Sequence, residues 1–218
     1  DTAWEALVER GVDWLDGWAK WVLAESPGNW LKVRRLVREG LIPVPQEDAY
    51  ITGLIAQQWP RKPLELLRSD PGLLEHEVWR LFEVEGGGED SLAARDKYSG
   101  GQWAHALRTL AEEGLLDRGR LLDASLAALQ RDFAQFRAGW FSAFHESLAP
   151  SVEERAAREE QYLALLGSRI PPTVSFALKA LAVLDKAGRL SGEALVGHAA
   201  PALAAREKGT VTLALKLL

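Results

Sequence analysis

Apolar residues recur at helical spacing along almost the entire chain, and no segment shows the strict alternation typical of a half-buried strand. The clearest helical segment follows Asp117. There, steps of four and three residues mark one helix face, formed by Leu122, Leu126, Leu129, Phe133 and Phe136. Leucine, alanine, arginine and glutamate are abundant, and each has a high helix propensity. The pattern predicts an all-α protein.

Start and stop signals divide the N-terminal region into helices. Residues 3–25 are expected to form one long helix, and a second runs from Trp30, with Asn29 as its cap, to a stop at Gly40. A third helix is expected over 47–59. Asp70 precedes a proline, the usual signal for an N-cap, and predicts a further helix over 71–84.

A glycine-rich, charged segment follows, over residues 86–101. Because glycine clusters interrupt regular structure, this segment is expected to be a mobile loop with at most a helical turn near Ser91. It predicts a division between an irregular helical region, 1–85, and a regular one, 102–218.

The helices of the second region have clear caps. Asp117 and Ser191 are candidate N-caps, and Ser151 with Glu154 has the spacing of a capping box. Asp123 lies between apolar stripe residues and is expected to need an arginine partner or water. The expected helices are 102–113, one after Asp117, one around "WFSAFHESL", 152–167, 173–187, 192–205 and one from Thr210.

Part of this region is repeated. Leu107 returns as Leu181 and Leu116 as Leu190 at one constant spacing, which accommodates two helix pairs of about 37 residues each. A single helix pair cannot bury its own apolar face, so successive pairs stack and share a core. The chain is therefore expected to be an α-solenoid of stacked antiparallel helix pairs, HEAT-like or ARM-like, with a right-handed superhelix and about 10–12 helices. Its apolar, uncapped C-terminus predicts a truncated array.

Composition narrows the classes of function. The formal net charge of −5 gives no general attraction for nucleic acid, and the absence of cysteine excludes disulfides and thiolate metal sites. No apolar run approaches the roughly 20 residues that span a bilayer. A cytoplasmic protein without a membrane segment is expected.

No group of residues predicts catalysis. The four histidines, His76, His105, His145 and His198, lack the spacing of a metal-binding pair and are expected to lie on helix surfaces or to be half-buried. The glycine clusters lack the lysine of a phosphate-binding loop. We therefore expect no catalytic residues, no metal site and no cofactor.

Tryptophan gives the strongest indication of binding. Trp14, Trp18 and Trp21 share one helix face, so they are either buried between helices or exposed to a protein partner. Trp103 and Trp140 are further candidates for partner binding.

A basic cluster leaves an alternative open. Its residues combine charge with an aromatic ring, as single-stranded nucleic acid sites do, and are Trp30, Lys32, Arg34, Arg35 and Arg38. The competing interpretation is a solvated face paired with acids such as Glu39.

Two segments carry a family resemblance: "LAEEGLLDRGRLLDASLAALQRDFAQFRAGWFSAFHESLAPSVEERAAREEQYLALL" and "PPTVSFALKALAVLDKAGRLSGEAL". They resemble an uncharacterised bacterial family of HEAT-like helical-repeat proteins from high-GC genomes, a domain of unknown function. The resemblance is strong over 103–218 and weaker through "LVREGLIP" and "LLEHEVWRLFEVEG". It implies a fold and a role in interaction. It also implies a multiprotein assembly, since such proteins are encoded beside AAA ATPases and von Willebrand-type proteins.

A shorter segment, "WAKWVLAESPGNWLKVRRLV", is similar to part of the bacterial alkylpurine DNA glycosylases built from HEAT-like repeats. The shared residues are Trp21, Ser26, Trp30 and Arg34.

The expected function is a non-enzymatic protein-interaction scaffold of a bacterial assembly. The alternative is a nucleic-acid-binding HEAT-like module or a glycosylase-like enzyme, which the acidic net charge opposes.

Overall fold

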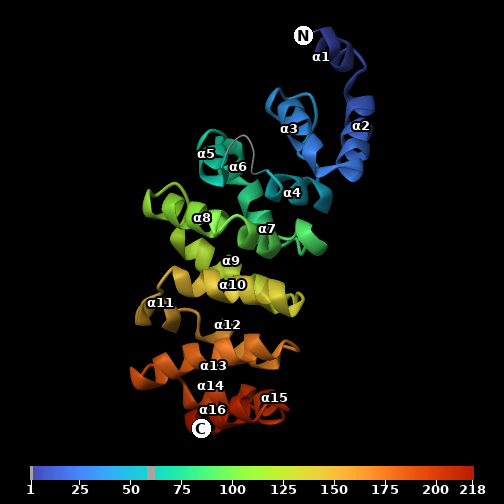
Figure 1. Ribbon diagram of the computed structural model, residues 1–218. Coiled ribbons are helices and arrows are strands. Elements are labelled where there is room, and N and C mark those ends of the chain that lie inside the picture. The colour runs from blue at the N-terminus through green and yellow to red at the C-terminus, as the bar shows by residue number, and fades with distance from the viewer. Residues whose placement is uncertain (1, 58–61) are drawn as a thin grey trace. The chain divides into compact units, whose positions relative to one another are not determined.

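The computed structural model describes residues 2–57 and 62–218, and all regular structure in these ranges is helical (Figure 1). The prediction of an all-α protein is confirmed. The described residues form sixteen α-helices and four 3-10 helices, more than the expected 10–12, because several predicted helices are divided. The end of the helix predicted over 47–59 lies outside the described residues. Among those described, no helix has the length and apolarity to cross a membrane.

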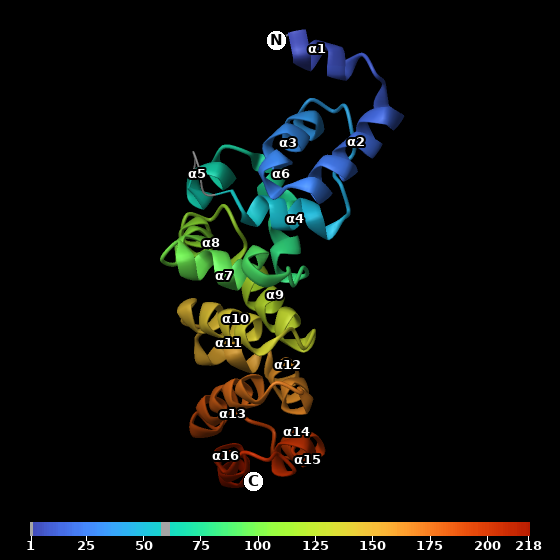
Figure 2. The same cartoon turned by 45° about the vertical axis from the view of Figure 1, so that its right-hand side comes forward.

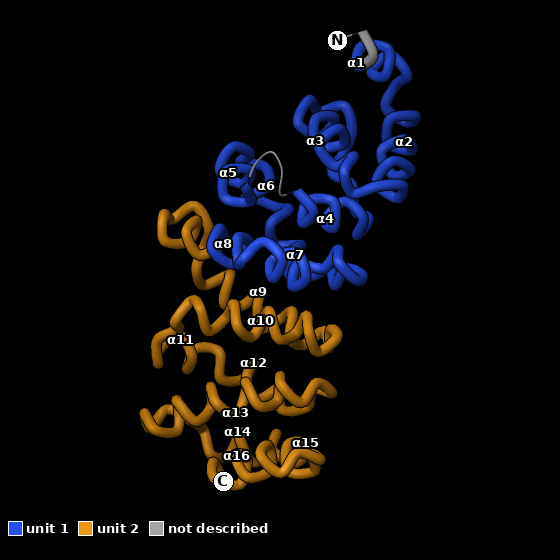
Figure 3. Tube along the Cα trace, in the orientation of Figure 1, with its two compact units in different colours: residues 1–106 blue, residues 107–218 orange. Residues whose placement is uncertain are grey.

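The chain divides into two compact units, residues 1–106 and 107–218, and the division falls within α8 (Gln102–Glu112) (Figure 3). The sequence placed a flexible boundary at 86–101 instead. That segment contains η3 (Gly88–Asp90) and α7 (Leu92–Tyr98). The Ser91 hydroxyl caps α7 by accepting the N–H of Ala94, and Leu92, Ala93 and Ala94 are buried.

Unit 1 begins with α1 (Thr2–Val8) and α2 (Val12–Glu25). The sequence predicted one helix here, but Gly11 has φ of 86°, a left-handed conformation that ends a helix. Residues on one side of α2 are buried against the next elements: Leu15, Ala19, Val22 and Leu23. A 3-10 turn, η1 (Pro27–Asn29), then leads into α3 (Trp30–Arg38). The predicted side-chain cap from Asn29 is absent.

The core of unit 1 forms around α4 (Asp48–Ile55), which packs against α2, α3, α7, η1 and η2. The Trp30 and Tyr50 rings meet there, with centroids 5.7 Å apart. Gly53 allows this contact, since an added Cβ would lie 2.9 Å from Cδ1 of Trp30. The remaining elements are α5 (Pro63–Arg68), α6 (Pro71–Glu75) and η2 (Glu77–Phe82), so the helix predicted over 71–84 is divided at His76.

Unit 2 consists of helices packed in successive layers, with α13 lying between α10 and α16 (Figures 1 and 2). Within the unit, α9 packs on α10, and α12 packs on α13. Its elements after α8 are α9 (Arg118–Gln130), α10 (Gln135–Ser147), α11 (Val152–Ala156), α12 (Glu159–Ala164), η4 (Leu165–Gly167), α13 (Pro171–Lys186), α14 (Gly192–His198), α15 (Ala200–Leu203) and α16 (Lys208–Leu217). The buried residues of α13 are thus covered by helices on both sides.

Local signals in unit 2 are largely confirmed. Asp117 and Ser191 cap α9 and α14, and Ser151 forms the predicted capping box with Glu154. The predicted partner of Asp123 is Arg158, whose Nε lies 2.7 Å from the carboxylate.

Two longer predictions in unit 2 are wrong. The apolar stripe after Asp117 does not continue through one helix, because α9 ends at Gln130 and Phe136 is exposed on α10. The helix predicted over 152–167 is interrupted at Arg158, which has φ of −120°.

Candidate functional site

Trp14, Trp18 and Trp21 form an aromatic strip on α2, here called the tryptophan ridge. Trp14 and Trp21 keep 44% and 60% of their surface exposed, and Trp18 is half-buried. The Trp14 and Trp18 rings stack with centroids 6.3 Å apart, and the Arg10 guanidinium lies 5.5 Å from the Trp14 ring. Because the other side of α2 is packed in the core, the ridge is presented on a fixed helix.

The other candidate tryptophans are placed differently. Trp103 is completely buried, and its Nε1 donates a hydrogen bond of 3.2 Å to the carbonyl oxygen of Ile55. It therefore cannot contact a partner. Trp140 is half-buried and stacks on Phe144 with centroids 5.2 Å apart.

The basic cluster does not form one surface. Trp30 is completely buried, and Arg34 keeps only 6% of its surface exposed. Arg35 pairs with Glu39 at 2.7 Å and lies over the ring of Trp4. The structure thus separates the residues that the nucleic-acid alternative required to act together.

The two remaining cations of the cluster are exposed. Lys32 donates to the Asn29 side chain at 3.1 Å, and Arg38 lies 3.9 Å from Asp70. Lys32, Arg35 and Arg38 therefore fit the competing interpretation, a solvated helix face.

Arg34 is instead the centre of a buried ionic cluster. Its Nε and Nη2 donate to the two oxygens of Asp70 at 2.7 and 2.6 Å, and its Nη1 donates to Glu77 at 2.6 Å. The Tyr50 hydroxyl donates to the second oxygen of Glu77 at 2.9 Å. Gly72 leaves space for the guanidinium, since an added Cβ would lie 2.9 Å from Nη2 of Arg34.

The cluster changes the pKa of each acid differently. Burial would raise the pKa of Asp70, but the hydrogen bonds and charge of Arg34 outweigh burial and lower it. For Glu77, burial prevails over Arg34 and raises the pKa. The side-chain cap that the sequence predicts for Asp70 is absent, and the cluster has no sequence signal because both acids are far from Arg34 along the chain.

Unit 2 contains a second buried polar group, formed by Ser125, His145 and Tyr162. The Ser125 hydroxyl donates to the Leu122 carbonyl at 2.8 Å, so it accepts from Nδ1 of His145, also at 2.8 Å. Nε2 of the same ring therefore accepts the Tyr162 hydroxyl at 2.6 Å. The expectation that the histidines are exposed or half-buried is wrong for His145, which is completely buried.

This arrangement resembles a nucleophile beside a base but is closed to solvent. Ser125 and Tyr162 are also completely buried. Burial lowers the pKa of His145 to about 4, so the imidazole is neutral at physiological pH. All polar atoms of the Ser125 hydroxyl and the His145 ring are satisfied within the protein, which is the behaviour of a structural polar core.

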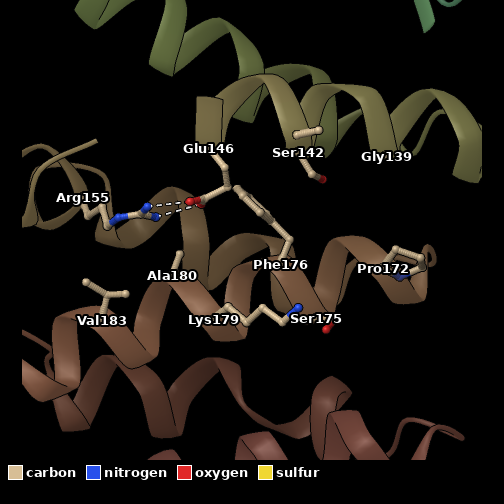
Figure 4. A pocket seen from close by; sticks show the side chains of 11 residues that line it. Gly139, Ser142, Glu146, Arg155, Pro172, Ser175, Phe176, Lys179, Ala180 and Val183 are labelled. Carbon is tan, nitrogen blue, oxygen red and sulfur yellow. Dashed lines mark hydrogen bonds and ion pairs between the residues drawn. The ribbon is translucent and has the colours of Figure 1, made fainter. Parts of the chain in front are cut away.

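A surface groove of about 540 Å³ runs between α10 and α13 (Figure 4). Its lining includes Gly139, Ala143 and Glu146 of α10 and Phe176, Lys179 and Ala180 of α13. Glu146 is held by Arg155 through two hydrogen bonds of 3.0 and 2.8 Å, drawn as dashed lines in Figure 4. The described residues include no group of three histidines or acids that could hold a metal ion.

A family model described as "Domain of unknown function (DUF6493)" matches residues 12–209, a range that contains the tryptophan ridge and the α10–α13 groove. No curated protein and no solved structure matches the chain.

Proposed function

The chain belongs to the DUF6493 family, and from that membership and the geometry above we propose that it is a non-enzymatic protein-binding scaffold. The binding surface is the tryptophan ridge of α2. The family carries no assigned activity, so the proposal depends on the side chains of the chain itself.

The exposure of the ridge carries this proposal. A tryptophan side chain in water forgoes the free energy of burial, about 25 cal/mol per Å² of apolar surface, and α2 presents Trp14 and Trp21 together. Tryptophan is the residue type most enriched among the residues that dominate protein interfaces. Exposed apolar strips on an otherwise packed helix are typical of such interfaces.

The position of the ridge adds a second argument. The buried residues Leu15, Ala19 and Leu23 fix the backbone of α2 to unit 1, so the helix itself loses little conformational freedom on binding. The stacking of Trp14 on Trp18 and the cation–π contact of Arg10 restrict the Trp14 and Trp18 rings. A rigid aromatic surface of this kind favours a folded protein as partner.

The layered packing of unit 2 supports a scaffold of helix pairs. Because α13 contacts both α10 and α16, each layer depends on its neighbours, as in the HEAT-like arrays that the sequence resembles. Proteins of AAA ATPase and von Willebrand type, the neighbours implied by that resemblance, are the first partners to test.

The test is affinity capture from the native cells with three forms of the chain: the parent, Trp14→Ala/Trp21→Ala, and Tyr98→Ala. Tyr98 is the matched control, since its aromatic ring is 71% exposed on another helix. We expect a protein that the parent and the Tyr98 variant retain and the double variant loses.

Two results would contradict the proposal. One is a set of captured proteins that is the same for all three forms. The other is salt-dependent binding of duplex DNA or single-stranded RNA at low micromolar concentration, which would favour the nucleic-acid alternative.

A further inference from the structure

We propose that the α10–α13 groove binds an amphipathic helix of a partner protein, with an acidic side chain of that helix paired to Lys179. This inference deepens the proposed function, because it assigns a partner class to a second surface. It concerns unit 2 alone, whereas the tryptophan ridge belongs to unit 1.

The wall formed by α10 has the geometry of a helix receptor. Gly139, Ser142, Ala143 and Glu146 line it, at the spacing of one helix face. The first three are small, and an added Cβ at Gly139 would meet no atom within 4 Å. A helix backbone can therefore approach this wall closely.

The wall formed by α13 supplies apolar surface along the same direction. Its lining residues include Phe176, Ala180 and Val183, again on one helix face. The lining extends from Pro172 to Val183, which at 1.5 Å per residue corresponds to about 16 Å, or three helical turns. A short amphipathic helix fills that length.

The lining of the groove is fixed before any partner binds. Phe176 packs against the His145 and Tyr162 rings, at centroid distances of 5.5 and 6.1 Å. The Arg155 guanidinium, almost completely buried, holds Glu146 through both carboxylate oxygens (Figure 4). The groove is therefore already formed in the free protein, which lowers the free-energy cost of binding.

The charges of the groove select an acidic partner. The negative charge of Glu146 is balanced by Arg155. Lys179 lines the other wall, and its ammonium has no ion-pair or hydrogen-bond partner among the described residues. A carboxylate on the bound helix complements the one charge that the groove leaves unbalanced.

The chemistry of the walls distinguishes a helix from an extended peptide. Both walls are helices, whose backbone groups are already bonded within each helix. An extended peptide in this groove would place unpaired N–H and C=O groups against mostly apolar side chains, whereas a helix satisfies its own.

The experiment selects ligands for the whole chain from a displayed library of helix-forming peptides randomised on one face. We expect recovered peptides to share an apolar strip at i, i+3, i+4 and i+7 with a recurrent aspartate or glutamate beside it. The best peptide is then synthesised and its affinity measured by calorimetry.

Two variants test the site without disturbing the core. Gly139→Leu fills the groove where a side chain meets open space, and Lys179→Glu reverses an exposed charge. Each substitution should lower the affinity for the peptide at least about tenfold. Replacing the peptide's acid with lysine should restore binding to the Lys179→Glu variant.

The matched controls are Gly197→Leu, where an added side chain also meets open space, and Lys186→Glu on the same helix as Lys179. Both control variants should bind the peptide as the parent does.

Several outcomes would overturn the inference. The first is that the library yields no peptide above background. The second is that Gly139→Leu leaves the affinity for the recovered peptides unchanged. The third is that the recovered peptides are extended, proline-containing sequences. Self-association of the parent that Gly139→Leu abolishes would assign the groove to a second copy instead. If partner capture still depends on Trp14 and Trp21 in any of these cases, the proposed function stands and the groove assignment alone fails.

Discussion

Arg34 shows how one side chain can decide the stability of unit 1. It is buried with two carboxylates, so its removal leaves Glu77 without its buried counter-charge and Asp70 with only the exposed Arg38, 3.9 Å away. A buried pair contributes little net stability compared with apolar residues, but an unpaired buried charge is strongly destabilising. The region therefore depends on each buried charge keeping its partner, more than on the strength of any one bond.

We predict that Arg34→Ala lowers the free energy of unfolding by about 3–5 kcal/mol. Chemical denaturation of the parent and the variant measures the difference. Lys32→Ala is the control, because Lys32 is exposed on the same helix and contacts neither acid of the cluster, and it should change stability by less than about 0.5 kcal/mol. Equal effects of the two substitutions would contradict the assignment of Arg34 to a buried cluster.

His145 predicts a defined dependence of stability on pH. Burial lowers its pKa from 6.5 to about 4, while Glu146 opposes this shift and Arg155 and Arg158 reinforce it. The unfolded chain therefore binds a proton as pH falls through 6.5, and the folded chain does not until about pH 4. The contribution of His145 to stability is present above pH 6.5 and is lost between pH 6.5 and 4.

We expect this loss to reach about 3 kcal/mol, measured by denaturation at steps of pH. His145→Gln keeps a donor and an acceptor but does not titrate, so its unfolding free energy should fall less steeply over the same window. A variant that retains the full slope of the parent would show that other groups cause the dependence.

At the scale of elements, α9 is the clearest test of the layered core. Leu126 is completely buried, whereas the adjacent Ala127 is exposed. We predict that Leu126→Asp prevents the folding of unit 2, because it places an unpaired charge between layers. Ala127→Asp should leave the helix content and melting temperature close to those of the parent, as followed by circular dichroism. A Leu126→Asp variant that melts like the parent would contradict the buried face.

Helix boundaries that depend on residues close together in the chain could be predicted from the sequence. The caps at Asp117, Ser151 and Ser191 depend on local hydrogen bonds, and all three are present. The expected continuous helices over 3–25 and 152–167 are interrupted at Gly11, where glycine is a local stop signal that the pattern of apolar residues overrode, and at Arg158, where no such signal is present. Propensity favours a continuous helix at Arg158, whereas Gly11 is itself a helix-stop signal of the same kind as Gly40.

At the scale of the molecule, the candidate sites differ in how far the sequence could predict them. The spacing of Trp14, Trp18 and Trp21 placed them on one face, but only packing decides which face is exposed. Trp103 was grouped with them although it is buried, because its contact with Ile55 joins distant parts of the chain. The α10–α13 groove has no local signal, since its two walls come from separate helices.

The central claim is that the tryptophan ridge binds a protein, and the most direct test is the affinity of the purified partner for the parent and its ridge variants. Calorimetry with the captured partner should show Trp21→Ala weakening the complex by at least about 2 kcal/mol, or roughly thirtyfold. Tyr98→Ala should bind as tightly as the parent. Equal affinity of the parent and Trp21→Ala, together with equal affinity of Trp14→Ala, would contradict the claim.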